Sequence, residues 1–176
     1  MREPRTHRPI DRSRKKRAVP LSILRTSEAV KTVVNHPRRL EELMRMLEDK
    51  DRAVRGRAAT ALARLSESHP ARLLRIVERL REGLRDDSAY VRWHLIYTLG
   101  ELGSRFPSQL QGFLNDIANR LEDDDRVVRV LACRTLSRVA VTRPGIIGEL
   151  FKGLKREPPP TVAKALERAG SKSRGA

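Results

Sequence analysis

A repeat of 37 residues is the feature that most limits how this chain can fold. Leu47, Leu84 and Leu121 open the related segments LEDKDRAVR, LRDDSAYVR and LEDDDRVVR, and successive segments are 37 residues apart both times. The same spacing relates three later prolines, Pro70, Pro107 and Pro144. Self-similarity at a fixed period is typical of a chain whose neighbouring units stack to bury one common core.

Each unit predicts two helices. The first follows an N-cap residue whose side-chain oxygen can accept a backbone N–H, and these residues are Asp51, Ser88 and Asp125. Apolar residues then recur three and four apart, as expected for the buried face of a helix. The second helix begins at the repeated proline, which suits a first helical position because its missing N–H needs no partner there. No run alternates with the period of a strand, so we expect an all-α fold.

The units at both ends depart from the repeat. Residues 21–34 predict a partial first helix, and the segment 37–47 predicts a second helix about one turn shorter than the others. After three consecutive prolines, Thr161 is expected to cap a last helix over 162–169, which Gly170 ends. We therefore expect a right-handed α-solenoid of antiparallel helix pairs, with about three full units and partial capping units at both ends.

Helix pairs that carry Leu-x-Asp, then Val-Arg, then a run rich in alanine and leucine resemble HEAT repeats. The closest kind is the short repeat found in lyase-type and scaffold proteins. The resemblance implies that the aspartates and arginines of this signature form a ladder between successive units: Asp49, Arg55, Asp86, Arg92, Asp123 and Arg129. The last helix has Val162-Ala163 in place of Val-Arg, so we expect the ladder to stop at the third unit.

Little in the sequence points to catalysis. The four histidines, His7, His36, His69 and His94, have no helical i, i+4 partner and share no carboxylate, so a metal site is not indicated. The single cysteine, Cys133, aligns with an alanine and an isoleucine of the other units, which predicts a small buried filler. We expect a chain that is not an enzyme and has no metal, no cofactor and no small-molecule substrate.

The longest stretch without a charged residue runs over 106–115, which is too short to span a bilayer. No apolar run of secretory type follows the basic N-terminus. These observations favour a cytoplasmic, or at least intracellular, protein without membrane contact, and they leave the nucleoid and the nucleus open.

Charge is the strongest hint about partners, since 38 Lys and Arg oppose 22 Asp and Glu for a net charge of +16. We divide the chain into a basic tail over 1–18 that is disordered when free, a solenoid over 19–170, and a short basic tail over 171–176. The N-terminal tail has no apolar periodicity and carries eight cations: Arg2, Arg5, Arg8, Arg12, Arg14, Lys15, Lys16 and Arg17. Such an arm can neutralise the phosphates of a nucleic acid.

The second helices, which line the concave face of HEAT arrays, add further arginines. The candidates are Arg38, Arg39, Arg45, Arg72, Arg75 and Arg79. Arginine contacts phosphate through a forked guanidinium, and no pattern for reading bases is visible. The sequence thus predicts a surface that binds the phosphate backbone of RNA or DNA, and a ribonucleoprotein such as a ribosome is one candidate partner.

The outer, convex layer offers a second candidate surface. Its members are Trp93, Tyr97, Val130, Arg64, Arg134 and Arg138. Aromatic residues flanked by arginine are the composition of a protein-contact hot spot, although the same residues could pack as core between repeats. We therefore expect a non-enzymatic adaptor that binds nucleic acid, with a protein-interaction scaffold for an acidic peptide or acidic protein surface as the alternative.

Overall fold

The structure is a computed structural model that describes residues 18–173, with the side chains of all of these except 109–111 and 171–173. The predicted phosphate contacts of the N-terminal tail, from Arg2 to Arg17, therefore lie outside the described residues, as does the prediction that this tail is disordered when free. The regular structure of the described part is entirely helical. This agrees with the all-α prediction.

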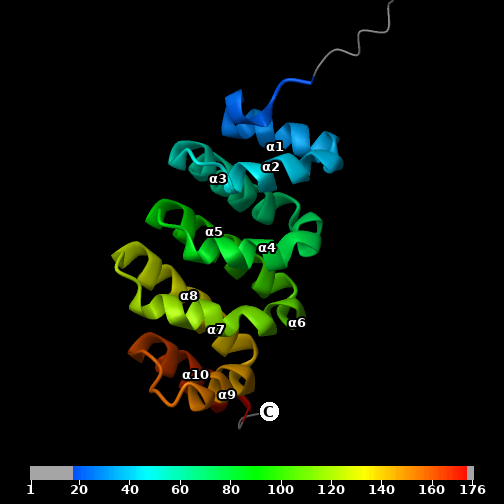
Figure 1. Cartoon of the computed structure of the whole chain (residues 1–176). Helices are drawn as coiled ribbons and strands as arrows, with labels where there is room; N and C mark the ends of the chain where they lie inside the picture. Colours follow the sequence, from blue (N-terminus) through cyan, green and yellow to red (C-terminus); the bar gives the residue numbers. More distant parts are fainter. Residues whose placement is uncertain (1–17, 174–176) are drawn as a thin grey trace, which may run out of the picture.

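The helices stack in two layers from one end of the molecule to the other (Figure 1). We call the first of these the first-helix layer, and it contains α1 (Thr26–Asn35), α3 (Arg52–Ser68), α5 (Ala89–Arg105), α8 (Arg126–Thr142) and α10 (Pro160–Ser173). The second-helix layer contains η2 (Pro37–Arg39), α2 (Leu40–Leu47), η3 (Pro70–Ile76), α4 (Val77–Glu82), η4 (Gly83–Arg85), α6 (Pro107–Leu110), η5 (Gln111–Phe113), α7 (Leu114–Asn119), η6 (Arg120–Glu122) and α9 (Pro144–Gly153). A short 3-10 turn, η1 (Leu21–Ile23), precedes both layers. The arrangement is an α-solenoid.

One hydrophobic core runs between the two layers along the whole array. Equivalent positions of the three units contribute equally to it, since Leu62, Leu99 and Leu136 are all completely buried. A helix that is apolar on one face can bury that face only against a neighbour, and here each unit provides the neighbour of the next. The core therefore positions every first helix in the same orientation, with the same residue positions facing outward.

Two of the three predicted N-caps act as such. The Asp51 carboxylate accepts a hydrogen bond from the Ala53 N–H at 2.8 Å, and Asp125 accepts from the N–H groups of Val127 and Val128. Ser88 occupies the equivalent position of α5 but makes no side-chain cap bond. The prediction of a side-chain cap is wrong at this residue, whose backbone N–H donates instead to Asp86 Oδ1 at 2.8 Å.

The second helices differ from the continuous helices that the sequence predicts. The repeated proline begins each of them, but between Pro70 and Arg85 the chain passes from 3-10 to α-helix and back. The unit after Pro107 begins as α-helix and then alternates between 3-10 and α-helix, whereas α9 is a single α-helix as predicted. Tight 3-10 turns are common at helix ends, and these helices are so short that their ends make up much of their length.

The last helix also differs from its prediction. It begins at Pro160 and continues to Ser173, beyond the end expected at Gly170. Thr161 lies within the first turn, and the N–H groups of Val162 and Ala163 donate to the Pro159 carbonyl. Proline has the backbone angle of a helix built in, so Pro160 can start the helix before the threonine that was expected to cap it.

Ion pairs connect successive units at the start of the first helices. Arg55 Nε donates to Asp86 Oδ2 at 2.8 Å, and Arg92 Nε donates to Asp123 Oδ2 at 2.9 Å. In each case the arginine of one unit reaches the aspartate of the next. Among the described residues, the Arg129 side chain bonds only to the backbone carbonyls of Asp123 and Asp124. Asp49 accepts from the Asp51 N–H within its own unit.

The pair between Arg92 and Asp123 is the more deeply buried of the two. The side chain of Asp123 is 1% exposed. Burial alone would raise the pKa of Asp123, but the hydrogen bonds from Arg92 and from the Asp125 N–H outweigh it and lower the pKa to about 2. The carboxylate is therefore held ionised, and the ladder contact is charged at neutral pH.

Candidate protein-interaction groove

The second-helix arginines are largely held by contacts inside the molecule. Arg72 Nη1 donates to the backbone carbonyl of Val34, and Arg75 Nη2 donates to that of Pro37 at 2.8 Å. Both carbonyls belong to the preceding unit. Val34 lies in the last turn of α1, where carbonyls lack a helical partner, whereas the Pro37 carbonyl also accepts from the Leu40 N–H.

Carboxylates hold two more of these arginines. Arg79 reaches Glu41 at 2.7 Å and Glu48 at 3.1 Å, while Arg39 pairs with Glu42 at 2.7 Å. Of the six second-helix candidates, Arg38 and Arg45 are exposed, and their side chains make no hydrogen bond or ion pair within the described residues. Four of the six predicted phosphate contacts thus already have intramolecular partners.

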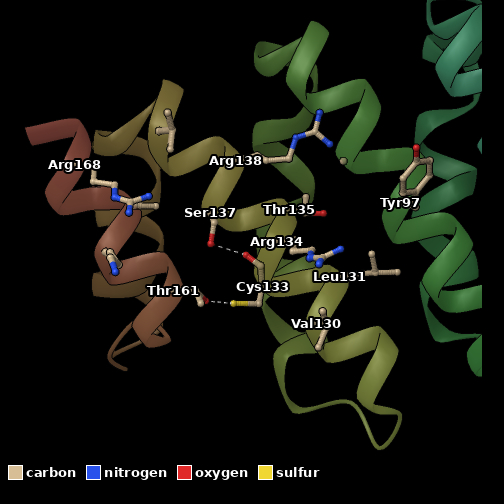
Figure 2. A pocket seen from close by; sticks show the side chains of 14 residues that line it. Tyr97, Val130, Leu131, Cys133, Arg134, Thr135, Ser137, Arg138, Thr161 and Arg168 are labelled. Atoms are coloured by element: carbon tan, nitrogen blue, oxygen red, sulfur yellow. Dashed lines mark hydrogen bonds between the residues drawn. The ribbon is translucent and has the colours of Figure 1, made fainter. Parts of the chain in front are cut away.

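A large groove lies on the other layer. It has a volume of about 910 Å³, and it lies over the outward face of α8 between α5 and α10 (Figure 2). We call it the α8 groove. Its lining from α8 begins at Val130 and ends at Val141, which corresponds to about 16 Å along the helix axis. A trough of this length can accept a helix of about three turns or an extended segment.

Positive charge lines the α8 groove, and part of it is exposed to solvent. Its cationic residues are Arg134, Arg138, Lys164 and Arg168, and no carboxylate is among the described residues that line it. Arg134 and Lys164 are exposed, and their side chains make no ion pair within the described chain. A concave surface with one sign of charge attracts ligands of the opposite sign.

The base of the groove is apolar. Val130 and Val141 are 43% and 52% exposed, and Leu131 and Ala165 lie beside them. Exposed aliphatic residues that are surrounded by charged ones mark an interaction surface more often than a plain solvated face. The α8 groove therefore combines apolar contact area with a cationic rim.

Close packing between α5 and α8 closes the bottom of the groove. A Cβ atom added to Gly100 on α5 would lie 2.8 Å from Thr135 Oγ1 on α8. Only a glycine lets the two helices approach so closely. The wall on the α5 side is therefore fixed by backbone packing.

Two side-chain contacts order the α5 wall. The Tyr97 hydroxyl donates to Glu67 at 2.6 Å, and Arg138 donates to Glu101 at 2.7 Å. The hydrogen bond to Glu67, together with burial, raises the pKa of Tyr97 to about 12. Glu101 is thus paired with a cation, whereas Glu67 keeps its negative charge beside the neutral Tyr97 hydroxyl.

The structure brings together four of the six predicted protein-contact residues. Tyr97, Val130, Arg134 and Arg138 all line the α8 groove. The other two lie elsewhere. Trp93 is half-buried against the core, with its ring 5.3 Å from that of Tyr90 in an edge-to-face contact, and Arg64 lines a different groove over α3.

Cys133 is half-buried, so the prediction of a small buried filler holds only in part: the side chain packs against the core and also lines the groove. Its sulfur lies beside the Thr161 hydroxyl of α10.

Sequence reasoning missed the contribution of α10, which supplies Thr161, Lys164, Ala165 and Arg168 to the groove. This helix does not follow the 37-residue repeat, so its outward positions were not assigned. Val162 is buried, as is Val128 at the matching place in α8. An alignment of these two valines would have given Lys164 the same position in its helix as the outward-facing Val130 has in α8.

A second groove lies over α3, and we call it the α3 groove. It has a volume of about 820 Å³ and includes Arg57, Thr60 and Arg64 of α3 with Tyr90 of α5. Tyr90 is 47% exposed. Its ring rests on Gly56, where an added Cβ would lie 3.2 Å from Tyr90 Cδ1, so this glycine allows the aromatic ring to lie flat against α3.

The described residues contain no group of three or more His, Cys, Asp or Glu that could hold a metal ion. None of the helices between residues 18 and 173 is both long and apolar enough to cross a membrane.

Two layers of antiparallel helices that share one core define a helical-repeat scaffold. A family model for HEAT repeats matches residues 40–117 and 77–171 of the chain. These matches together span most of the sequence, and the chain belongs to the HEAT-repeat family. No curated protein sequence matches it.

Solved structures show the same fold at low sequence identity. An engineered protein is 22% identical with a TM-score of 0.59, and the match covers 85% of this chain and 68% of that one. A designed armadillo repeat protein in complex with the peptide (KR)4 is 19% identical with a TM-score of 0.59, covering 85% and 69%. A computationally designed armadillo repeat protein for modular peptide recognition is 19% identical with a TM-score of 0.62, covering 85% and 79%.

Proposed function

We propose that this chain is a non-enzymatic protein-interaction scaffold that binds an acidic segment of another protein in the α8 groove. The observation that carries the proposal is the groove itself, about 910 Å³ in volume, in which Arg134 and Lys164 are exposed without an ion pair in the described chain and no carboxylate is among the described lining residues. Its apolar base fits the aliphatic side chains of such a segment, and its rim fits the carboxylates.

Relatives in fold support peptide recognition as the kind of function. One of the solved structures is a designed armadillo repeat protein in complex with the basic peptide (KR)4. This chain carries a net charge of +16. Because this charge is positive, we expect the chain to bind an acidic peptide, whereas that designed protein binds a basic one.

Direct binding of a defined peptide tests the proposal. The probe is a fluorescein-labelled amphipathic peptide of about 12 residues, long enough to fill the groove as a helix, with glutamates and leucines at helical spacing. We expect its fluorescence anisotropy to rise with the full-length protein. The double variant Arg134→Glu/Lys164→Glu should weaken binding about tenfold, since exposed ion pairs contribute up to about 1 kcal/mol each.

A matched control separates groove contacts from net charge. Lys31 and Arg85 are exposed and lie outside both grooves, so Lys31→Glu/Arg85→Glu makes the same charge change elsewhere. We expect this variant to bind within about twofold of the wild type, because distant exposed charges are screened by salt. Equal loss in both double variants, or no binding by the wild type, would contradict the proposal.

Nucleic-acid binding stays a second candidate because of the N-terminal tail. Eight of residues 1–17 are cationic against two acids, and residues 1–17 lie outside the described part of the chain. A generic single-stranded RNA and a duplex DNA are the appropriate probes. With about six phosphate contacts, affinity should fall roughly a thousandfold between low and moderate salt, and deletion of residues 1–17 should weaken it further.

The outcomes separate the two functions. RNA or DNA binding that depends on the tail and on Arg38 and Arg45, with no binding of the acidic peptide, would favour the nucleic-acid function. Peptide binding that depends on the α8 groove and survives the tail deletion would favour the scaffold. A cytoplasmic location belongs to the proposal under either outcome.

A further inference from the structure

We infer that the α3 groove is a second site for an acidic segment, so that one partner occupies the α3 and α8 grooves at once. The inference rests on the proposed function, because it takes the α8 groove as the first site. The observation behind it is that the same positions of the repeat line both grooves.

The two grooves use the same positions of the repeat. Two units before Val130, Leu131, Arg134 and Arg138 lie Gly56, Arg57, Thr60 and Arg64. The first set belongs to the α8 groove and the second to the α3 groove. Because every first helix sits in the same orientation on the common core, equivalent positions present their side chains to the same face of the array.

The chemistry of the α3 groove also suits carboxylates. The side chains of Arg57 and Arg64 are exposed and make no hydrogen bond or ion pair within the described residues. The single acid of the groove, Asp51, is already used as the cap of α3. The exposed ring of Tyr90 supplies apolar contact area, as the valines do in the α8 groove.

The surface between the grooves does not prevent one ligand from crossing it. α5 lies between α3 and α8, and the one acid in its sequence, Glu101, is paired with Arg138. Glu67, at the end of α3, keeps its charge and accepts from the Tyr97 hydroxyl. A linker without charge that passes over α5 therefore meets a neutralised carboxylate and aromatic surface.

The separation of the grooves sets the length of the connection. Packed helices lie 8 to 10 Å apart, so the axes of α3 and α8 are separated by about 20 Å across α5. A Gly/Ser linker of about 12 residues has a root-mean-square length of about 20 Å. When the linker matches the separation, binding of the second segment becomes intramolecular and the affinity rises without any new kind of contact.

A tandem probe tests the inference. It joins two copies of the fluorescein-labelled glutamate–leucine peptide through a Gly/Ser linker of about 12 residues, and the single-copy peptide is the reference. We expect the tandem probe to bind the full-length protein at least about tenfold more tightly than the single copy, at a stoichiometry of one probe to one protein. Arg57→Glu/Arg64→Glu should remove this gain.

The same variant contains its own folding control. Arg57→Glu/Arg64→Glu leaves the α8 groove intact, so the single-copy peptide should bind it as it binds the wild type. A tandem probe that gains nothing, or a gain that survives Arg57→Glu/Arg64→Glu, would overturn the second site while the α8 groove stands. If the single-copy peptide fails to bind the wild type, the proposed function is overturned, and this inference with it.

Discussion

Arginine has different surroundings in the two helix layers. In the second-helix layer, Arg72, Arg75 and Arg79 reach back to carbonyls and carboxylates of the preceding unit. In the first-helix layer, Arg57 and Arg134 extend from the outward face and make no ion pair within the described residues. The same residue type joins units in one layer and is presented to solvent in the other.

The difference shows that an arginine adds to the binding charge of a surface only when its guanidinium has no acceptor within the molecule. A guanidinium that already has carbonyl or carboxylate acceptors must give them up before it binds a new anion, and that exchange reduces the net gain. The second-helix layer has the more prominent row of arginines in the sequence, but these arginines are less available to an external anion than those of the first-helix layer. This comparison predicts which substitutions change stability and which change only binding.

The largest effect is expected where a held arginine is also buried. Arg92→Ala leaves the buried Asp123 carboxylate without its partner, and we expect a loss of about 3 to 5 kcal/mol in the free energy of unfolding. Urea denaturation followed by circular dichroism measures it. Arg129→Ala is the matched control, because Arg129 holds the same repeat position without a carboxylate partner, and it should lose about 1 kcal/mol. Equal losses would show that the ion pair is unimportant.

A somewhat smaller effect is expected in the pH dependence of stability. The pKa of Asp123 is lowered to about 2, below the value of about 3.9 expected in the unfolded chain. The stabilisation is therefore fully present above about pH 4, and it disappears as the pH falls toward 2. It amounts to about 2 kcal/mol. Wild type and Asp123→Asn should converge in unfolding free energy over this range, and a constant difference between them would contradict the assignment.

The direct comparison between the layers is expected to be smaller again. Arg72→Met removes donors from two carbonyls of the preceding unit and should cost about 1 to 2 kcal/mol. Arg134→Met on the outward face of α8 should change stability by less than about 0.5 kcal/mol. Thermal unfolding of the two variants measures both. If Arg134→Met were the more destabilising, the contrast between the layers would be wrong.

The smallest effect concerns the α5 wall of the groove. Tyr97→Phe removes the hydrogen bond to Glu67 and should cost less than about 1 kcal/mol at neutral pH, because the contact is partly exposed. Its spectroscopic signature is clearer than its energy. The pKa of Tyr97 is raised to about 12, so the ultraviolet titration of the wild type should contain a late tyrosine ionisation that is missing in the variant.

Much of the fold was predictable because it is repeated. Leu62, Leu99 and Leu136 lie at the same position of each repeat, within apolar residues that recur three and four apart. Such a pattern places these residues on one face of a helix, and that face is the buried one in the structure. The partners of the second-helix arginines were not predictable. Arg72 lies opposite the apolar stripe of its own helix, which suggests solvent, but its side chain is long enough to reach the unit before it.

The candidate site was predictable only in part. Tyr97, Val130, Arg134 and Arg138 were identified because the repeat shows which positions face outward. Lys164 and its neighbours were not, because α10 does not keep the period and its register depends on where Pro160 starts the helix. The α8 groove therefore lies between helices that follow the 37-residue repeat, α5 and α8, and one that does not, α10. The repeat predicts only the residues that α5 and α8 contribute.

The ladder gives the array a direction. Every rung joins an arginine to an aspartate further along the sequence, first Arg55 to Asp86 and then Arg92 to Asp123. A duplicated copy of residues 84–120, placed in frame after the original, would offer an acceptor to the unit before it and a donor to the unit after it. An inserted repeat therefore forms the same ion pairs with both neighbours as the original repeats do. Arrays of this kind can gain or lose whole repeats by recombination while the residues of their binding faces change.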